Sequence, residues 1–124
     1  MQSGRFAILE HRTAQGVHWD FLLEWGGVLR TWALHRPPEP GGKIAARRLP
    51  DHRTLYLDYE GSLSRNRGSV RRWAWGTYRL RDESGGSLVV ELAGSRMAGG
   101  ELAGRVALLR DAEGEPHWSL EVEG

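Results

Sequence analysis

Short apolar segments alternate with turn residues along the whole chain. The segments are rich in β-branched, aromatic and leucine side chains, and no window spaces its apolar residues three and four apart over three helical turns. The glycine pairs Gly26-Gly27 and Gly99-Gly100 mark two of the turns. We therefore predict an all-β protein, with strands at Phe6–Arg12, His18–Trp25, Val28–Leu34, Lys43–Arg48, Leu55–Leu63, Val70–Arg81, Ser87–Ala93, Glu101–Arg110 and His117–Val122.

About eight to nine short strands in one small chain leave many strand edges to protect. Closure into a barrel and packing of two sheets are the ways in which such a chain protects them. We expect a small closed or partly open β-barrel, formed by residues 1–124 as a single domain, because a chain of this length encloses one hydrophobic core. The proline-rich segment 35–42 cannot lie in a central strand, so we expect it to cross an end of the barrel.

Two histidines and an aspartate lie close together near the start of the chain. His18 and Asp20 are two residues apart, and such residues project from the same face of a strand. A short, glycine-containing segment at 13–17 can fold the strand that carries His11 back against them as a hairpin. Two imidazoles and one carboxylate suit manganese, iron or zinc. The alternative is that both histidines are ordinary, partly buried residues.

A second polar pair follows the predicted strand at 43–48. His52 and Tyr56 are four residues apart, so in an extended chain they share a face and both can reach a bound anion. The alternative is a capped turn with a tyrosine at its rim.

The composition limits the chemistry and the location of the protein. Cysteine is absent, which excludes disulfides, zinc–thiolate sites and thiol nucleophiles. Histidine, carboxylate and hydroxyl groups therefore carry any reaction. No apolar run is long enough to cross a bilayer, and the first residues lack the apolar segment of a signal peptide. We expect a cytoplasmic protein that does not contact a membrane.

The net charge of +1 conceals an uneven distribution. Basic residues gather between Lys43 and Arg72, whereas residues 111–124 contain acids but no lysine or arginine. Inside the basic part, arginine and tryptophan alternate in Arg71-Arg72-Trp73-Ala74-Trp75. This alternation is typical of nucleic-acid grooves and also of edge strands, where the tryptophans are packing residues.

Several motifs, taken in order, resemble one known family. They are His11 with His18-Trp19-Asp20-Phe21-Leu22-Leu23-Glu24, Val28-Leu29-Arg30-Thr31-Trp32-Ala33, Asp51-His52 with Tyr56, Tyr59-Glu60-Gly61, and Trp75-Gly76-Thr77-Tyr78. Together they resemble the 3′-phosphoesterase module of bacterial DNA ligase D over nearly the whole chain. Within that family, the chain resembles the small stand-alone members.

The resemblance implies a compact β-barrel that holds one manganese ion, with other divalent transition metals as alternatives. Such a barrel removes 3′ phosphates and 3′ ribonucleotides during DNA end joining, and leaves a 3′ hydroxyl. By the matching motif, His11, His18 and Asp20 would bind the metal, and His52 would contact the scissile phosphate with Tyr56 beside it. The implied partners are nucleic-acid 3′ ends, of DNA or RNA–DNA, and a separate ligase or polymerase; we expect a monomer.

Two positions depart from the family pattern. Leu22 stands where the family usually has an arginine that grips the phosphate, and Ile44 aligns with a second expected arginine. Lys43, Arg47 and Arg48 lie close to Ile44 in sequence, and a shortened loop after Gly61 contains two further arginines. We predict that the phosphate is bound instead by Arg48, Arg65 and Arg67.

Three functions remain open from the sequence. The first function is a phosphoesterase that tolerates the absence of a bidentate arginine, although such a loss lowers the rate on the order of 10²- to 10³-fold. The second is a binding module of the same fold that recognises a nucleic-acid end or a repair protein without catalysis. The third is a barrel whose histidines are purely structural.

Overall fold

The computed structural model describes residues 2–97 and 99–124 and consists almost entirely of strands. These are β1 (Ser3–Thr13), β2 (Gly16–Trp25), β3 (Val28–Leu34), β4 (Lys43–His52), β5 (Gly61–Ser62), β6 (Ser69–Ser84), β7 (Ser87–Arg96), β8 (Glu101–Arg110) and β9 (His117–Val122). One short 3₁₀ helix, η1 (Thr54–Leu57), precedes β5. The prediction of an all-β protein is confirmed, and β3, β8 and β9 have the predicted bounds.

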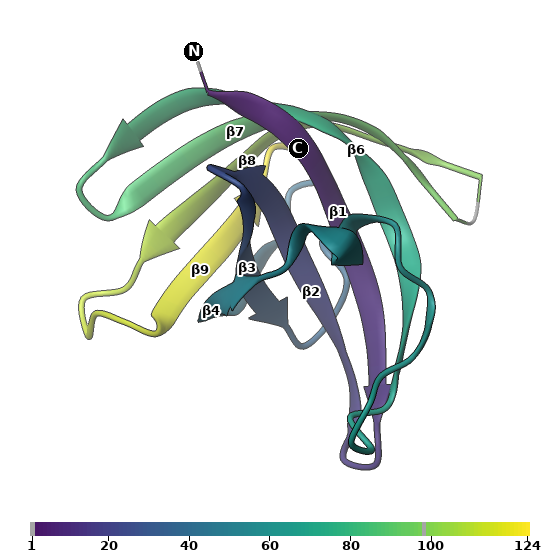
Figure 1. Cartoon of the computed structure of the whole chain (residues 1–124). Helices are drawn as coiled ribbons and strands as arrows, with labels where there is room; N and C mark the ends of the chain where they lie inside the picture. The colour runs from purple at the N-terminus through teal and green to yellow at the C-terminus, as the bar shows by residue number, and fades with distance from the viewer. Residues whose placement is uncertain (1, 98) are drawn as a thin grey trace.

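The strands form one antiparallel sheet that returns to its starting strand. Its order is β1-β2-β3-β4-β9-β8-β7-β6-β5, and β1 also pairs with β6, so eight strands complete a ring while β5 lies outside it. Figure 1 shows this sheet curving around a central space, with β1, β2 and β6 as long strands on one side. The expected closed or partly open barrel-like sheet is therefore present.

The main hydrophobic core fills the inside of the ring. Alternate residues of each strand point inward, for example Phe6 and Ile8 on β1 and Phe21 and Leu23 on β2. Trp32 is the largest fully buried side chain of the molecule's described part. Four other tryptophans, Trp19, Trp25, Trp73 and Trp118, pack against this core while partly exposed.

A second, smaller cluster lies on the outer face of β1, β2 and β3. Leu9, Leu22 and Leu29 point away from the main core, and Leu57 of η1 packs onto them. The predicted strand Leu55–Leu63 is therefore wrong. Instead of pairing within the ring, the segment turns at η1, buries Leu57 and crosses the outer face of the sheet before the two residues of β5 pair with β6 (Figure 1).

Strand β4 runs four residues beyond its predicted end, and this extension positions His52. Pairing with β9 stops at Arg47, and the pairing with β3 shifts register between Leu49 and His52. Pro50 lies within that shift, where a missing backbone N–H interrupts no regular ladder. The bulge brings His52 opposite Leu29, on the same outer face as Leu22.

The segment at 35–42 lies outside the strands, as its prolines predicted. Its end is held to β9 by backbone hydrogen bonds: the N–H of Gly41 donates to the carbonyl of Val122, and the N–H of Val122 donates to Gly42. Within residues 2–97 and 99–124, no helix has the length and apolar character that a membrane span requires.

Candidate metal and phosphate site

The β1–β2 hairpin places His11, His18 and Asp20 together on the outer face of the ring. His11 is directly opposite His18, and Asp20 is opposite Leu9, so the three polar side chains share the face of the smaller hydrophobic cluster. The predicted hairpin and the predicted shared face of His18 and Asp20 are both present. The sequence achieves this by alternation, because the intervening Trp19 packs against the inner core.

The three side chains point their donor atoms at one another. His11 Nδ1 lies 3.2 Å from His18 Nε2 and 3.5 Å from Asp20 Oδ2. Asp20 Oδ1 is buried and lies 3.1 Å from His18 Nε2, yet among residues 2–97 and 99–124 it has no partner in hydrogen-bond geometry. All three ligand atoms lie within 4.8 Å of one another. The cluster therefore leaves a buried carboxylate oxygen and two imidazole nitrogens that a divalent transition metal can satisfy.

Backbone contacts fix which nitrogen of His11 faces the cluster. Its Nε2–H donates to the carbonyl oxygen of Arg67 at 2.7 Å, so Nδ1 carries the lone pair that points toward His18 and Asp20. A hydrogen bond of this kind, from the second nitrogen to a carbonyl, is the usual way in which proteins orient a metal-binding histidine.

Burial and charge act in opposite directions on the site's titratable groups. Contact with the Asp20 carboxylate raises the pKa of His11, against the opposing effect of burial. Burial alone would raise the pKa of Asp20, but the two imidazoles outweigh it and hold that pKa below its usual range. Asp20 is therefore ionised near neutral pH, as a metal ligand must be.

His52 and Tyr56 lie across a small cavity from this cluster. The cavity encloses about 90 Å³, and it is lined by Leu9, His11, Asp20, His52, Tyr56, Leu63, Arg67 and Val70. The rings of His52 and Tyr56 are 6.2 Å apart, and Nδ1–H of His52 donates to the carbonyl of Pro50 at 2.8 Å. The predicted pairing of these residues is present, although η1 rather than an extended strand brings them together.

The three members of the cluster differ in their exposure to solvent, and His18 is the most exposed. The side chain of His18 is 33% exposed, whereas those of His11 and Asp20 are 17% and 6% exposed. Leu9, Leu63 and Val70 form the apolar part of the cavity lining. The cluster is therefore exposed to solvent mainly at His18.

The structure separates the three arginines that the sequence assigned to the phosphate. Arg67 reaches the cavity, but its guanidinium donates to the backbone and hydroxyl oxygens of Ser64, so its carbonyl is the group that contacts His11. Arg65 lies on the exposed loop beside it. Arg48 is not brought to the site: its guanidinium lies 4.6 Å from the centre of the Trp32 ring and 2.9 Å from Asp51.

Both departures from the expected pattern are buried in apolar surroundings. Leu22 is fully buried in the smaller cluster, on the same face as Asp20. Ile44 is buried in the main core, on the opposite side of the sheet, so an arginine at that position of this fold would point away from the cluster. Only Leu22 therefore occupies a place from which an arginine side chain could have faced the site.

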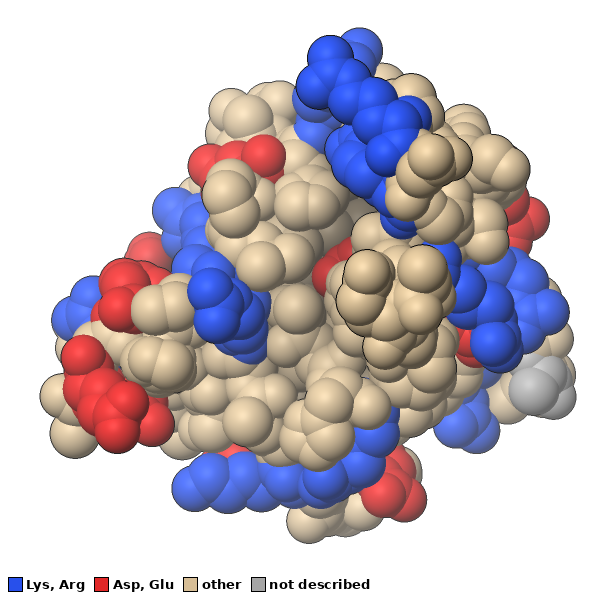
Figure 2. Space-filling model, turned by 90° about the horizontal axis from the view of Figure 1, so that it is seen from below, with Lys and Arg blue, Asp and Glu red and all other residues tan. Residues whose placement is uncertain are grey.

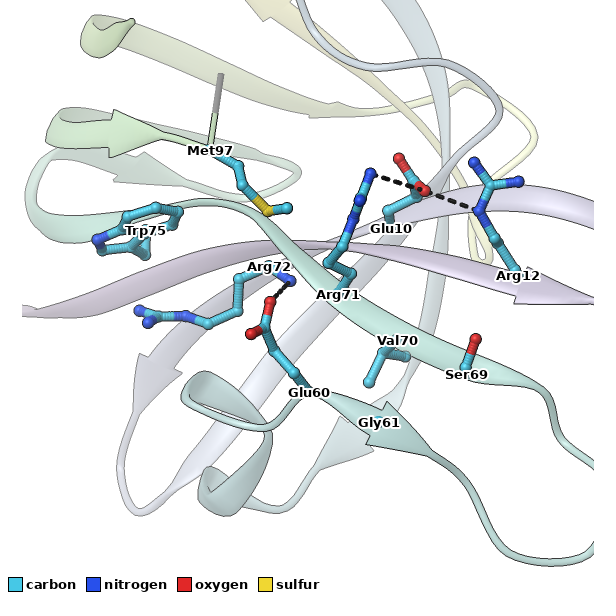
Figure 3. A pocket seen from close by; sticks show the side chains of 10 residues that line it. All are labelled: Glu10, Arg12, Glu60, Gly61, Ser69, Val70, Arg71, Arg72, Trp75 and Met97. Atoms are coloured by element: carbon cyan, nitrogen blue, oxygen red, sulfur yellow. Dashed lines mark hydrogen bonds and ion pairs between the residues drawn. The ribbon is translucent and has the colours of Figure 1, made fainter. Parts of the chain in front are cut away.

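A larger open cavity of about 720 Å³ lies at the edge of β6, between β5 and the end of β7. Figure 3 shows that its charged groups neutralise one another: Glu10 contacts Arg12 at 2.9 Å and Arg71 at 3.6 Å, and Glu60 accepts the backbone N–H of Arg72. Arg72 also lies over the ring of Trp75. The arginine–tryptophan alternation thus forms contacts within the chain, and its predicted role in nucleic-acid binding stays a prediction.

Charged side chains on the lower face of the molecule are likewise mixed. Figure 2 shows several separate groups of lysine and arginine there, divided by uncharged residues and by acidic groups. This view presents no continuous basic stripe among the residues that it draws. Any recognition of an anion on this face therefore depends on individual side chains rather than on a broad field.

Two site contacts could not be found from the sequence. The carbonyl of Arg67 orients His11, and the carbonyl of Pro50 orients His52. Every residue has a backbone carbonyl, so the residue type does not indicate this role. The positions of the side chains themselves were readable, because strand alternation and a short hairpin fix them.

Comparisons with known proteins relate the chain to one family. The family model of the DNA ligase D 3′-phosphoesterase domain matches residues 9–110. The chain is 32% identical over 111 residues to the multifunctional non-homologous end joining protein LigD of Pseudomonas aeruginosa. It is 34% identical over 114 residues to the multifunctional non-homologous end joining DNA repair protein LigD of Mycobacterium tuberculosis.

These alignments cover 86% and 85% of this chain but only 13% and 14% of the two relatives, so the similarity concerns one module of much longer proteins. Within the matched residues lie all three members of the histidine–aspartate cluster and both members of the His52–Tyr56 pair. The chain belongs to the DNA ligase D 3′-phosphoesterase domain family.

Proposed function

We propose that this protein is a divalent-metal-dependent phosphoesterase that removes 3′ phosphates or 3′ ribonucleotides from nucleic-acid ends during DNA repair. The observation that carries the proposal is the cluster of His11, His18 and Asp20, with its unpartnered carboxylate oxygen, facing His52 and Tyr56 across one cavity. Manganese is the metal that we propose, because imidazole and carboxylate ligands together accept it.

The side chains of the cavity have distinct tasks in this proposal. A metal ion held by His11, His18 and Asp20 would supply positive charge to a phosphate oxygen and to the attacking water. The carbonyl of Arg67 keeps Nδ1 of His11 directed at the cluster. Because the carbonyl of Pro50 accepts Nδ1–H of His52, Nε2 is the ring nitrogen left to contact the phosphate.

Tyr56 and the apolar wall complete the site. The ring of Tyr56 packs edge-on against both His52 and Tyr59, which fixes the direction of its hydroxyl group. Leu9, Leu63 and Val70 supply an apolar wall to the cavity, which displaces water there. Exclusion of water strengthens each electrostatic contact with the phosphate.

A second candidate is a module that binds nucleic-acid ends without turnover. The observation that favours it is the burial of Leu22, which leaves no guanidinium at the position where the family usually has one. This candidate predicts salt-dependent binding of DNA ends, because neutralised phosphates release counterions, but no product.

Turnover of defined ends separates the two candidates. The substrates are primer–template duplexes that end in a 3′ phosphate or in a single 3′ ribonucleotide, incubated with manganese, with magnesium or with a chelator. We expect manganese-dependent formation of a 3′ hydroxyl, which Asp20→Asn reduces by about 3 kcal/mol or about 10²-fold in rate. The exposed Asp82→Asn removes the same charge far from the cavity and is the matched control.

Absence of product with every metal, at protein concentrations where the ends are bound, would overturn the enzymatic proposal in favour of the binding module. An Asp20→Asn variant that keeps the full rate would show that the cluster is not the site of the reaction.

A further inference from the structure

A shallow groove on the outer face of the sheet begins at His18, the most exposed member of the cluster of His11, His18 and Asp20. It has a volume of about 330 Å³, and His18 belongs both to its wall and to the cluster. Its other exposed or half-exposed lining residues are Ala33, His35, Ala45, Arg47, Asp111, His117 and Trp118. Because His18 belongs to both, the groove is continuous with the most exposed member of the cluster.

Strand register explains why the groove exists and what borders it. Asp20 pairs with Ala33, Ala33 with Arg47, and Arg47 with His117, so these four residues form one row across β2, β3, β4 and β9. Ala33 contributes only a methyl group, which leaves a depression between Asp20 and Arg47. With a spacing of about 4.8 Å between strands, the backbones of Asp20 and Arg47 are about 10 Å apart.

Arg47 and its neighbour Arg48 have opposite surroundings. Arg48 faces inward, stacks on Trp32 and pairs with Asp51, and burial lowers its pKa. Arg47 faces outward and is exposed at the groove; within residues 2–97 and 99–124 no acidic side chain forms an ion pair with it. Its guanidinium is therefore free to bind an anion that lies over Ala33, next to the metal cluster.

We propose that this groove seats a backbone phosphate of the nucleic-acid strand, and that Arg47 supplies the cationic contact that Leu22 does not. The inference rests on the proposed function, since it names how a nucleic-acid end would lie at the same site. Arginine suits this role because its planar fork of N–H donors matches two phosphate oxygens at once.

The charges at the two ends of the groove assign the phosphate to one of them. Asp111 lines the groove beside His117, because its N–H donates to the carbonyl of His117. His117 in turn lies 3.7 Å from Glu113. These acids disfavour an anion at that end, so the phosphate belongs at the end between Arg47 and His18, and a sugar or base occupies the far end.

The test measures binding separately from turnover. A 3′-phosphorylated, fluorescently labelled oligonucleotide duplex is titrated with the full chain in chelator, at several salt concentrations, and the same variants are then assayed for turnover with manganese. We expect Arg47→Ala to weaken binding about tenfold and to reduce the slope of log affinity against log salt by about one. The matched control is Arg81→Ala, which removes the same charge from an exposed position of β6 that does not line the groove.

A second variant probes the floor of the groove without touching Arg47. Ala45 is exposed on β4, so Ala45→Glu is expected to fold and to weaken binding by placing a negative charge beside the seat of the phosphate. Circular dichroism verifies that both variants are folded before binding is compared.

The outcomes distinguish this inference from the function on which it rests. Weaker binding by Arg47→Ala and Ala45→Glu than by Arg81→Ala supports the groove, even if the wild-type protein shows no turnover. Binding and salt slope that are unchanged in Arg47→Ala, or reduced equally in Arg81→Ala, would overturn it even if the protein proves to be a phosphoesterase. Failure of the wild-type chain to bind the duplex at low salt would also overturn it.

Discussion

Truncation of Leu22 should destabilise the whole domain as well as disturb the site. Its side chain is fully buried between the sheet and Leu57 of η1, so Leu22→Ala leaves a cavity beneath the lid at residues 53–63. A Leu→Ala change at a fully buried position costs about 2 to 5 kcal/mol. In a domain of this size each kcal/mol lowers the melting temperature by roughly 4 °C, so we expect a fall of roughly 8 to 20 °C.

Thermal unfolding followed by circular dichroism measures this loss, with Leu22→Met as the control. Methionine conserves the volume and should cost less than about 1.5 kcal/mol. The same argument predicts that Leu22→Arg does not restore a phosphate contact. A guanidinium without a partner in this apolar cluster costs several kcal/mol, a large part of the roughly 5 to 15 kcal/mol that holds such a domain folded.

Two results would refute this reasoning about Leu22. One is a loss below about 1 kcal/mol for Leu22→Ala, which would mean that the lid does not pack as described. The other is a Leu22→Arg protein that melts at the wild-type temperature and turns over its substrate faster, which would show that the position is open to the site.

Three further predictions concern other parts of the fold. Tyr56→Phe keeps the ring packing against His52 and should leave the melting temperature within a few degrees of wild type while slowing turnover by about 10² or more, a ratio that single-turnover kinetics measures; an unchanged rate would remove the hydroxyl from the mechanism. Gly68→Ala should destabilise the protein and weaken metal binding, because its φ is +87° and a Cβ there would collide with the carbonyl of Arg12, next to His11; Gly85→Ala, where a Cβ meets no atom within 4 Å, is the control, and equal melting temperatures for both variants would contradict the prediction. Arg48→Ala should lower stability by about 1 to 2 kcal/mol through loss of its contact with the Trp32 ring, as chemical denaturation would measure, and a loss below about 0.5 kcal/mol would contradict the prediction.

Much of the sheet could be read from the sequence because strand alternation is a local property. The bounds of β3, β8 and β9 follow from the apolar pattern and its glycine-containing turns. The same pattern gave a wrong prediction for residues 55–63. Their leucine and tyrosine residues resemble a strand, but Leu57 is buried on the outer face of other strands, and only the complete sheet shows that this face needs a cover.

The candidate site, like the sheet, was only partly predictable from the sequence. His18 and Asp20 share a face by spacing alone, and a short hairpin suffices to bring His11 beside them. Arg47 and Arg48 are adjacent in sequence, and which of them faces the cluster depends on the register of β4 against β3. A shift of one residue exchanges the two faces of a strand, so the choice between these arginines needed the structure.

Manganese binding followed by electron paramagnetic resonance tests the central claim most directly, because the signal of the free aqueous ion disappears as the ion is bound. We expect the wild-type chain to bind one ion, His18→Ala and Asp20→Asn each to lose it, and the exposed Asp82→Asn to retain it. No binding by the wild-type chain, or binding that survives both substitutions in the cluster, would contradict a metal site formed by His11, His18 and Asp20.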